Sequence, residues 1–218
     1  METPEDNGRI LLINKPLRWT SFDVVNKLRY ALKTKKIGHA GTLDPLATGL
    51  LIICVGKMTK RIEEFMGQEK EYTGKFVIGQ RTVSHDLETP VSEQNDISLI
   101  TPEDIYSTAS TLVGNILQLP PQHSAIRIKG KRAYEFAREG KTIELAPREV
   151  TVKSFEIDGI NLPEVSFRIV CSKGTYIRSL VRDFGDQLNV GAYLAELCRT
   201  RIGGFKLEDA VTVEQVKL

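Results

Sequence analysis

Two hydrophobic periods alternate along the chain, one typical of strands and one typical of helices. The continuous apolar run at 50–55 (LLIICV) predicts a central strand buried on both faces. A further apolar run and three alternating runs predict strands over 9–14, 70–78, 149–157 and 164–171. We expect the last two to be antiparallel neighbours joined across a turn at 158–159.

Helical spacing separates these strands. Phe22, Val25, Leu28 and Leu32 recur every three or four positions, and Thr20 or Ser21 precedes them as an N-cap. Similar patterns predict helices over 57–65, 101–113, 133–138 and 177–188, and Thr175 is the predicted N-cap of the last. A helix through Leu194 and Leu197, a strand near 201–205 and a polar C-terminal helix are predicted to follow. Residues 84–100 are predicted to be mostly loop. Because strands and helices mix without regular βαβ alternation, the fold class is predicted to be α+β.

Composition adds bounds to this picture. The 218 residues, 41% hydrophobic and 27% charged, suit one sizeable core, so we expect a flexible leader over 1–8 and a single domain over 9–218. Three distant cysteines without a CxxC pair argue against disulfides and structural zinc. The polar N-terminus and the lack of long apolar runs favour a cytoplasmic protein that is not in the membrane, and a monomer is our default.

Charge is distributed unevenly along the chain. The net charge is only +2, but residues 82–126 contain no Lys or Arg, while basic residues are frequent before and after them. The segment at about 120–150 is rich in basic residues, among them Arg127, Lys129 and Lys131. Such a segment is typical of an arm that covers a polyanion, although ordinary solvated faces give the same pattern.

Asp44 is the first candidate catalytic residue. It lies in the glycine-containing motif GHAGTLDPLATG at 38–49, and Asp23 is the only other acid between Asp6 and Glu63. Asp before Pro often serves only to start a turn. However, a lone carboxylate in a basic field stays ionised and lies where a polyanion would bind.

Arg178 is the second candidate, because it falls in the first turn of the predicted helix 177–188. The helix dipole disfavours a cation there, so an anion such as Asp44 or an RNA phosphate is expected to compensate its charge. The alternative is a surface arginine paired with Asp183 or with water. His85 and His123 are isolated and no phosphate-binding glycine loop occurs, so metal and nucleotide cofactors are not expected.

Several motifs together resemble one known family. They are LINKP at 12–16 with TSFD at 20–23, HAGTLDPLATG at 39–49, GKMTK at 56–60, KEY at 70–72, GQRT at 79–82 and CSKGTYIRSL at 171–180. These segments, in this order, resemble the TruB-type tRNA pseudouridine-55 synthases over nearly the whole chain. Many bacterial relatives carry a further PUA domain, so the chain is expected to be a short form or to lack a tail.

The resemblance implies a fold and an activity. The fold would be that of the pseudouridine synthases, with a mixed, mostly antiparallel central sheet flanked by helices and an inserted basic RNA-binding arm. The activity would be isomerisation of the T-loop uridine (position 55) of tRNA after base flipping, without a cofactor or metal. Asp44 would be the nucleophile, attacking either the sugar C1′ or the uracil C6.

The resemblance also implies roles for other residues. Arg178 would pair with Asp44, and Tyr72 would stack on the target base and help remove its C5 proton. His39 would fill the space left by the flipped base, Tyr176 and Leu197 would line the pocket, and Lys15 would support it. Arg127, Lys129 and Lys131 would contact phosphates of the T stem-loop. The competing interpretations are a non-catalytic RNA-binding module of the same fold and an aspartate-nucleophile hydrolase, for which the DxD-type motif is missing.

Overall fold

The computed structural model describes residues 8–124, 127–128 and 130–217. The chain forms two compact units, which are described separately. Unit 1 comprises Met1–Thr73 and Glu196–Leu218, and unit 2 comprises Gly74–Ala195. The predicted leader lies, except for Gly8, outside the described residues. A single catalytic domain over 9–218 stays a prediction.

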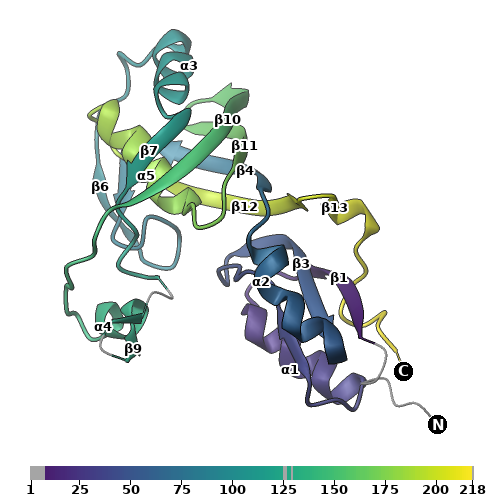
Figure 1. Ribbon diagram of the computed structural model, residues 1–218. Coiled ribbons are helices and arrows are strands. Elements are labelled where there is room, and N and C mark those ends of the chain that lie inside the picture. The colour runs from purple at the N-terminus through teal and green to yellow at the C-terminus, as the bar shows by residue number, and fades with distance from the viewer. Residues whose placement is uncertain (1–7, 125–126, 129, 218) are drawn as a thin grey trace. The chain divides into compact units, whose positions relative to one another are not determined.

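The central strand of unit 1 is β3 (Ala47–Val55), as the apolar run predicted (Figure 1). All of β1 (Arg9–Lys15) pairs antiparallel with β3, and β2 (Ile37–His39) pairs antiparallel with the end of β3. β12 (Ala192–Ile202) pairs in parallel with the beginning of β3, and its own end pairs antiparallel with β13 (Phe205–Lys206).

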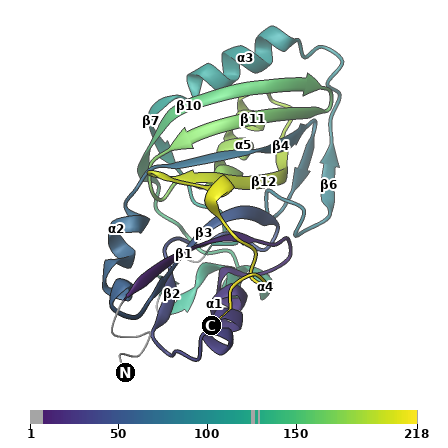
Figure 2. The ribbon, with the colours of Figure 1, turned by 90° about the vertical axis from the view of Figure 1, so that its right-hand side faces the viewer.

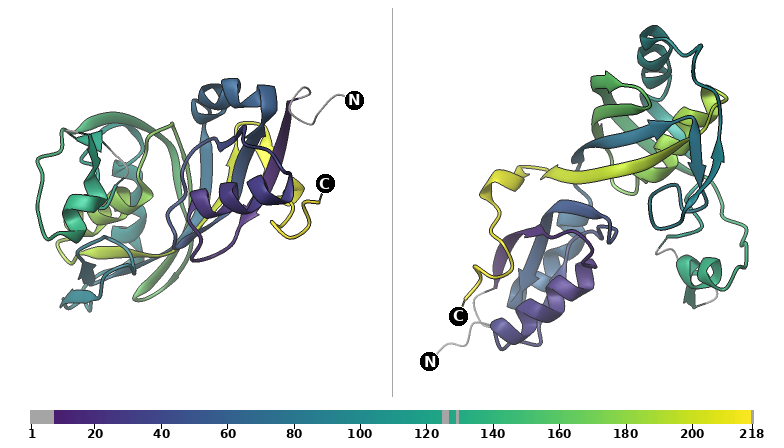
Figure 3. Two further views of the ribbon diagram at one scale, coloured as in Figure 1. Left: turned by 90° about the horizontal axis from the view of Figure 1, so that it is seen from below. Right: turned by 180° about the vertical axis from the view of Figure 1, so that it is seen from behind.

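Both faces of β3 are buried because its side chains alternate between two hydrophobic clusters. Leu51, Ile53 and Val55 pack in one cluster with α1 (Ser21–Ala31). Leu50, Ile52 and Cys54 pack in the other with Phe65 of α2 (Ile62–Met66), which follows the 3₁₀ helix η1 (Gly56–Arg61). The left view of Figure 3 shows α1 (purple) and α2 (blue) on opposite sides of the unit 1 strands.

The start of α1 confirms the predicted cap. The Thr20 hydroxyl accepts a hydrogen bond from the Asp23 amide, and the Asp23 carboxylate accepts one from the Thr20 amide. The predicted apolar face is wrong at Phe22, which is 58% exposed, whereas Val24 is fully buried. One residue is about 100° of helix turn, so Phe22 falls outside the stripe that faces β3.

In unit 2 the strand order is β12, β4 (Lys70–Ile78), β11 (Glu164–Cys171), β10 (Arg148–Asn161) and β7 (Gly114–Gln118) (Figure 2). β10 is antiparallel to both of its neighbours. Four phenylalanines, one of them Phe184 of α5 (Ile177–Gln187), pack ring against ring on this sheet. Another helix of this unit, α3 (Pro102–Thr111), is capped by Thr101 and confirms the predicted start.

The mostly antiparallel α+β fold is confirmed, with corrections at several elements. The hairpin between β10 and β11 turns at 162–163, and the predicted turn at 158–159 is only a register irregularity inside β10. Residues 84–100 are mostly loop, as predicted, but they include one short strand, β6 (Val91–Gln94), which pairs with β5 (Gln80–Thr82). The N-cap of α5 is Tyr176 and not Thr175, whose hydroxyl bonds back to the Ser172 carbonyl.

The largest correction concerns the C-terminal quarter. Leu194 and Leu197 lie in strand β12, not in a helix, because pairing with β3 outweighs the helical preference of Ala, Leu and Glu. The polar C-terminal helix is also wrong: after the 3₁₀ turn η2 (Leu207–Asp209) the described residues bridge to β1 at Val211.

The predicted arm begins after β7. It contains a short hairpin, β8 (Arg127–Ile128) with β9 (Lys131–Arg132), and then α4 (Ala133–Arg138), which confirms the predicted helix. Across the described residues, no helix is both long enough and apolar enough to cross a bilayer.

Candidate active site

Asp44 lies in the loop of unit 1 that joins β2 to β3, which we call the Asp44 loop (residues 40–46). The loop closes as a turn in which the Ala47 amide donates to the Asp44 carbonyl at 3.0 Å. Asp44 is half-buried, and the neighbouring Leu43 is 4% exposed. The buried Ser21 hydroxyl accepts from the Leu43 amide at 2.8 Å and donates to its carbonyl at 3.2 Å. The first turn of α1 therefore holds the residue before Asp44.

Lys15 supports the other side of this loop. It is fully buried, and its Nζ donates to the carbonyls of Trp19 at 2.6 Å, Pro16 at 2.9 Å and, more distantly, Pro45 at 3.5 Å. Burial lowers the pKa of Lys15 to about 8; the Asp44 charge opposes this shift and the Arg199 charge adds to it. Lys15 therefore places a positive charge near Asp44, which favours the ionised carboxylate.

Three other predicted site residues also lie in unit 1. Leu197 is opposite Ala47 in the parallel pairing of β12 with β3, next to the end of the Asp44 loop. His39 is the last residue of β2, directly before that loop, and is half-buried. Tyr72 lies in the part of β4 that belongs to unit 1 and is 8% exposed. The fold thus brings Lys15, His39 and Leu197 to the loop that carries Asp44.

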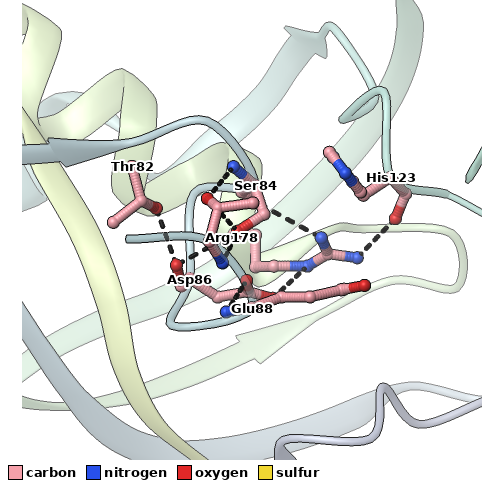
Figure 4. A network of polar contacts seen from close by, with 7 residues as sticks. Thr82, Ser84, Asp86, Glu88, His123 and Arg178 are labelled. Atoms are coloured by element: carbon pink, nitrogen blue, oxygen red, sulfur yellow. Dashed lines mark hydrogen bonds and ion pairs between the residues drawn. The ribbon is translucent and has the colours of Figure 1, made fainter. Parts of the chain in front are cut away.

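Arg178 lies in unit 2, in the first turn of α5, and is 3% exposed. Its Nη1 donates to the Ser84 carbonyl at 3.2 Å and its Nη2 to the His123 carbonyl at 2.8 Å (Figure 4). Its Nε lies 3.5 Å from a carboxylate oxygen of Asp86, which is itself 5% exposed. The alternative of a surface arginine paired with Asp183 is wrong, since Asp183 pairs with Arg182 at 2.6 Å.

The loop between β5 and β6 is built to present Asp86. Hydroxyls of Thr82 and Ser84 both donate to its backbone carbonyl, and its carboxylate accepts from the Glu88 amide at 2.9 Å. The anion expected to compensate Arg178 is therefore, within unit 2, Asp86. The pairing of Arg178 with Asp44, a residue of the other unit, stays a prediction.

Tyr176 precedes Arg178 and is fixed by Gln118, a fully buried residue at the end of β7. The Gln118 amide group accepts from the Tyr176 amide at 2.8 Å and donates to its carbonyl at 3.1 Å. The guanidinium of Arg148 lies 4.4 Å from the centre of the Tyr176 ring, in a cation–π contact. Gln118 thus fixes the backbone at the N-cap of the helix that carries Arg178.

The arm residues are only partly described. Arg127 pairs with Arg132 across the β8–β9 hairpin. Lys131 is exposed, and its ammonium lies 5.9 Å from the centre of the Phe136 ring. Lys129 lies outside the described residues. Among the described residues, no group of three or more His, Cys, Asp or Glu side chains is arranged to hold a metal ion.

Three supporting residues were missed from the sequence: Arg199, Asp86 and Gln118. Arg199 is 1% exposed and donates to three carbonyls around the Asp44 loop. The assignment of its segment to a helix hid the signal, which is a charged residue in an otherwise half-buried strand. In the sequence, Asp86 is only one of six acids in the segment 82–126, which has no Lys or Arg. Gln118 had no signal, because a buried amide looks like any polar residue in the sequence.

The lowered pKa of Lys15 predicts a specific pH dependence of stability. The folded chain loses this proton at about pH 8, whereas an unperturbed lysine loses it near 10.5. The unfolded chain therefore binds more protons between these values, and Lys15 makes the free energy of unfolding rise with pH across this window by about 3 kcal/mol. Urea unfolding at pH 7.5, 9 and 10 should show this extra slope in the wild type and not in Lys15→Met. Equal slopes in both proteins would contradict it.

Comparison with known proteins identifies the family of the chain. Residues 29–177 match the model of the TruB family pseudouridylate synthase N-terminal domain, and residues 178–218 match the tRNA pseudouridylate synthase B C-terminal domain. The chain is 52% identical to tRNA pseudouridine synthase B of Flavobacterium johnsoniae, covering 97% of this chain and 96% of the relative. It is 49% identical to that of Phocaeicola vulgatus, covering 95% and 91%.

Solved structures show the same fold. A Cbf5–Nop10–Gar1 complex contains a chain that matches with a TM-score of 0.74 at 29% identity, covering 94% of this chain and 52% of that one. An H/ACA RNP bound to a substrate RNA containing 2′-deoxyuridine matches with a TM-score of 0.70 at 28% identity, covering 94% and 51%. Since the two family models together span residues 29–218, the chain belongs to the TruB family and is an isomerase that forms pseudouridine in tRNA.

Proposed function

We propose that the chain converts the T-loop uridine at position 55 of tRNA to pseudouridine, with Asp44 as the nucleophile. The observation that carries this proposal is the Asp44 loop, which holds one carboxylate beside a buried cation in a chain of the TruB family. A nucleophile needs a fixed position and an ionised form, and the loop favours both.

The reaction breaks the bond between C1′ and N1, turns the uracil and joins its C5 to C1′. The hydrogen at C5 leaves as a proton and the released N1 takes up a proton from solvent, so uridine and pseudouridine have the same composition and no oxidant or co-reactant is needed. Asp44 attacks either C1′ of the ribose or C6 of the uracil. Both routes require that the uridine be flipped out of the folded T-loop to reach the carboxylate.

The other predicted site residues take supporting roles in this proposal. Arg178 pairs with Asp44, and Tyr72 stacks on the uracil and helps to remove its C5 proton. His39 occupies the space that the flipped base leaves, and Tyr176 and Leu197 line the pocket. The buried guanidinium of Arg178 is held by two carbonyls and Asp86, which supports a fixed orientation.

The arm gives a testable prediction about binding. Arg127, Lys129 and Lys131 contact phosphates in this proposal, so replacing all three by Gln removes up to three counterion-releasing contacts. The plot of log K against log salt for a T-arm stem-loop should then become less steep by about 2 to 3. Filter binding from 50 to 300 mM salt measures this slope. An unchanged slope would place the phosphate contacts elsewhere on the chain.

Release of the C5 hydrogen tests the proposed function directly. A T-arm stem-loop labelled with tritium at uridine C5 should lose its label to water when incubated with the chain, up to one tritium per RNA. A second stem-loop, with cytidine at position 55 and label at its other uridines, should keep its label. Retention of label by the first RNA would contradict the proposal.

The assembly and location of the enzyme belong to the same proposal. We expect a monomer that acts in the cytoplasm, where tRNA is matured. Light scattering coupled to size-exclusion chromatography should give a mass near 24.4 kDa for the purified chain. A mass of twice that value at micromolar concentration would contradict the monomer.

A further inference from the structure

We infer that Arg199 is a positioning residue: its guanidinium ties the Asp44 loop to the sheet and so fixes the nucleophile. The inference rests on the proposed role of Asp44. Arg199 lies in β12, within unit 1, and is 1% exposed. It was not a candidate from the sequence, and it has no place in the chemistry proposed above.

The three nitrogens of the guanidinium divide between the strand and the loop. Nε donates to the carbonyl of Leu50 in β3 at 2.8 Å. Nη2 donates to the carbonyl of Gly41 at 3.2 Å, and Nη1 to that of Thr42 at 3.4 Å. The rigid, planar fork of arginine thus spans the central strand and the part of the loop that leads to Asp44.

These contacts complete a continuous set along the loop. The Leu43 carbonyl accepts from Ser21, the Asp44 carbonyl from the Ala47 amide, and the Pro45 carbonyl from the Arg18 amide and from Lys15. Together with those of Gly41 and Thr42, five successive carbonyls of residues 41–45 therefore accept hydrogen bonds. Arg199 donates the hydrogen bonds to the first two of these carbonyls, those of Gly41 and Thr42. Without Arg199 both carbonyls lose their side-chain donor.

The backbone is shaped to let Arg199 approach. Arg199 lies opposite Gly49 in the parallel pairing, where Gly49 has φ +100°. A Cβ at Gly49 would lie 2.4 Å from the Arg199 carbonyl oxygen and 2.7 Å from its amide nitrogen. Only glycine therefore allows the two strands to come this close at the end of the motif.

Electrostatics gives a second reason to look for a function. Among the described residues, the hydrogen bonds of Arg199 go to carbonyls and no carboxylate forms an ion pair with it. Burying a cation without a carboxylate partner is costly, so packing alone is a poor explanation for this residue. Its charge also acts on Lys15, whose pKa is shifted by Asp44 as well, so Arg199 lies within the electrostatic field of the nucleophile.

Two substitutions of Arg199 separate the effect of its forked hydrogen bonds from the effect of its positive charge. Arg199→Lys keeps the positive charge but has one nitrogen, which cannot reach Leu50, Gly41 and Thr42 together. Arg199→Met loses both. With saturating enzyme and the tritium-labelled T-arm stem-loop, we expect single-turnover rates about 10-fold lower for Arg199→Lys and about 100-fold lower for Arg199→Met, because small misplacements of a reacting group have effects of this size. The dissociation constant for the RNA should stay within about 2-fold of the wild type.

Amide hydrogen exchange supplies a readout that does not depend on activity. Exchange at the amides of residues 41–44 should become faster in Arg199→Lys, while exchange in β3 stays as in the wild type. Arg201 offers a matched control on the same side of β12, since it pairs with Glu69 at 2.8 Å and Glu71 at 3.6 Å instead of the loop. Arg201→Lys should leave the rate and the exchange at 41–44 unchanged.

The outcomes distinguish this inference from the proposed function. If Asp44→Asn is inactive and folded Arg199→Lys turns over at the wild-type rate, the inference is overturned and the proposed function stands. If Asp44→Asn is active, the proposed function itself fails. A rate loss in Arg199→Lys that equals the loss in Arg201→Lys would also overturn the inference. Should Arg199→Met not fold, Arg199→Lys decides alone.

Discussion

Asp44→Asn should abolish pseudouridine formation, with a loss of at least about 10⁴-fold in the single-turnover rate. The amide has nearly the same shape as the carboxylate, so the turn closed by the Ala47 amide and the clamp on Leu43 by Ser21 should stay intact. What is lost is the charge and the nucleophilic oxygen. Affinity for a T-arm stem-loop should therefore change by less than about 3-fold, and the melting temperature should stay close to that of the wild type.

The matched control is Asp23→Asn. Asp23 is the only other acid between Gly8 and Arg61, lies in the same unit and caps α1 at the surface. Asn at the N3 position keeps a side-chain oxygen that can accept from the Thr20 amide, so this variant should keep most of its activity. Substantial turnover by Asp44→Asn, or an equal loss in both variants, would contradict the role of Asp44.

Arg178→Lys should lower the single-turnover rate by about 10² to 10³-fold with RNA affinity nearly unchanged. Arg178 makes three directed contacts, to the carbonyls of Ser84 and His123 and to the carboxylate of Asp86. A single ammonium cannot reproduce this geometry, so the substitution keeps the positive charge but loses the forked hydrogen bonds. The rate of tritium release at saturating enzyme measures the effect.

Arg182→Lys is the control for this prediction. Arg182 lies one turn further along α5, donates to the Leu119 carbonyl and pairs with Asp183. It has no place in the proposed site, so its replacement should leave the rate within about 2-fold. A rate for Arg178→Lys that matches the control would mean that the forked contacts of Arg178 do not matter for catalysis.

The parts of the fold that follow from local pattern were predictable from the sequence. The run at 50–55 is the centre of β3, since a strand buried on both faces must be apolar throughout. Thr20 and Thr101 both cap helices in the way that their neighbours Asp23 and Asp104 indicate. In such places the sequence near a residue determines its structure.

The segment at 192–202 was not predictable in this way. Its Ala, Leu and Glu residues favour a helix, yet pairing with β3, nearly 150 positions away, makes it a strand. This error is the reason that Arg199 was missed, because a helix would place it on a different surface. Long-range pairing decides the conformation here, and no local pattern records it.

In the candidate site, too, some residues were predictable from the sequence and others were not. Asp44 stands out because it is isolated in a basic segment, and Arg178 stands out because the start of a helix is a poor place for a cation. The second argument correctly predicted an anionic neighbour. It did not identify Asp86, which the loop between β5 and β6 brings to Arg178 from almost 100 positions earlier. Partners brought together by tertiary structure require the structure itself.

The most direct test of the central claim is to map pseudouridine along a full-length tRNA transcript. The purified chain is incubated with the transcript, and pseudouridines are located by carbodiimide labelling and primer extension. We predict one strong signal, at the T-loop uridine 55, with the wild type and none with Asp44→Asn. Modification at a different uridine, no modification by folded wild-type protein, or an equal signal with Asp44→Asn would contradict it.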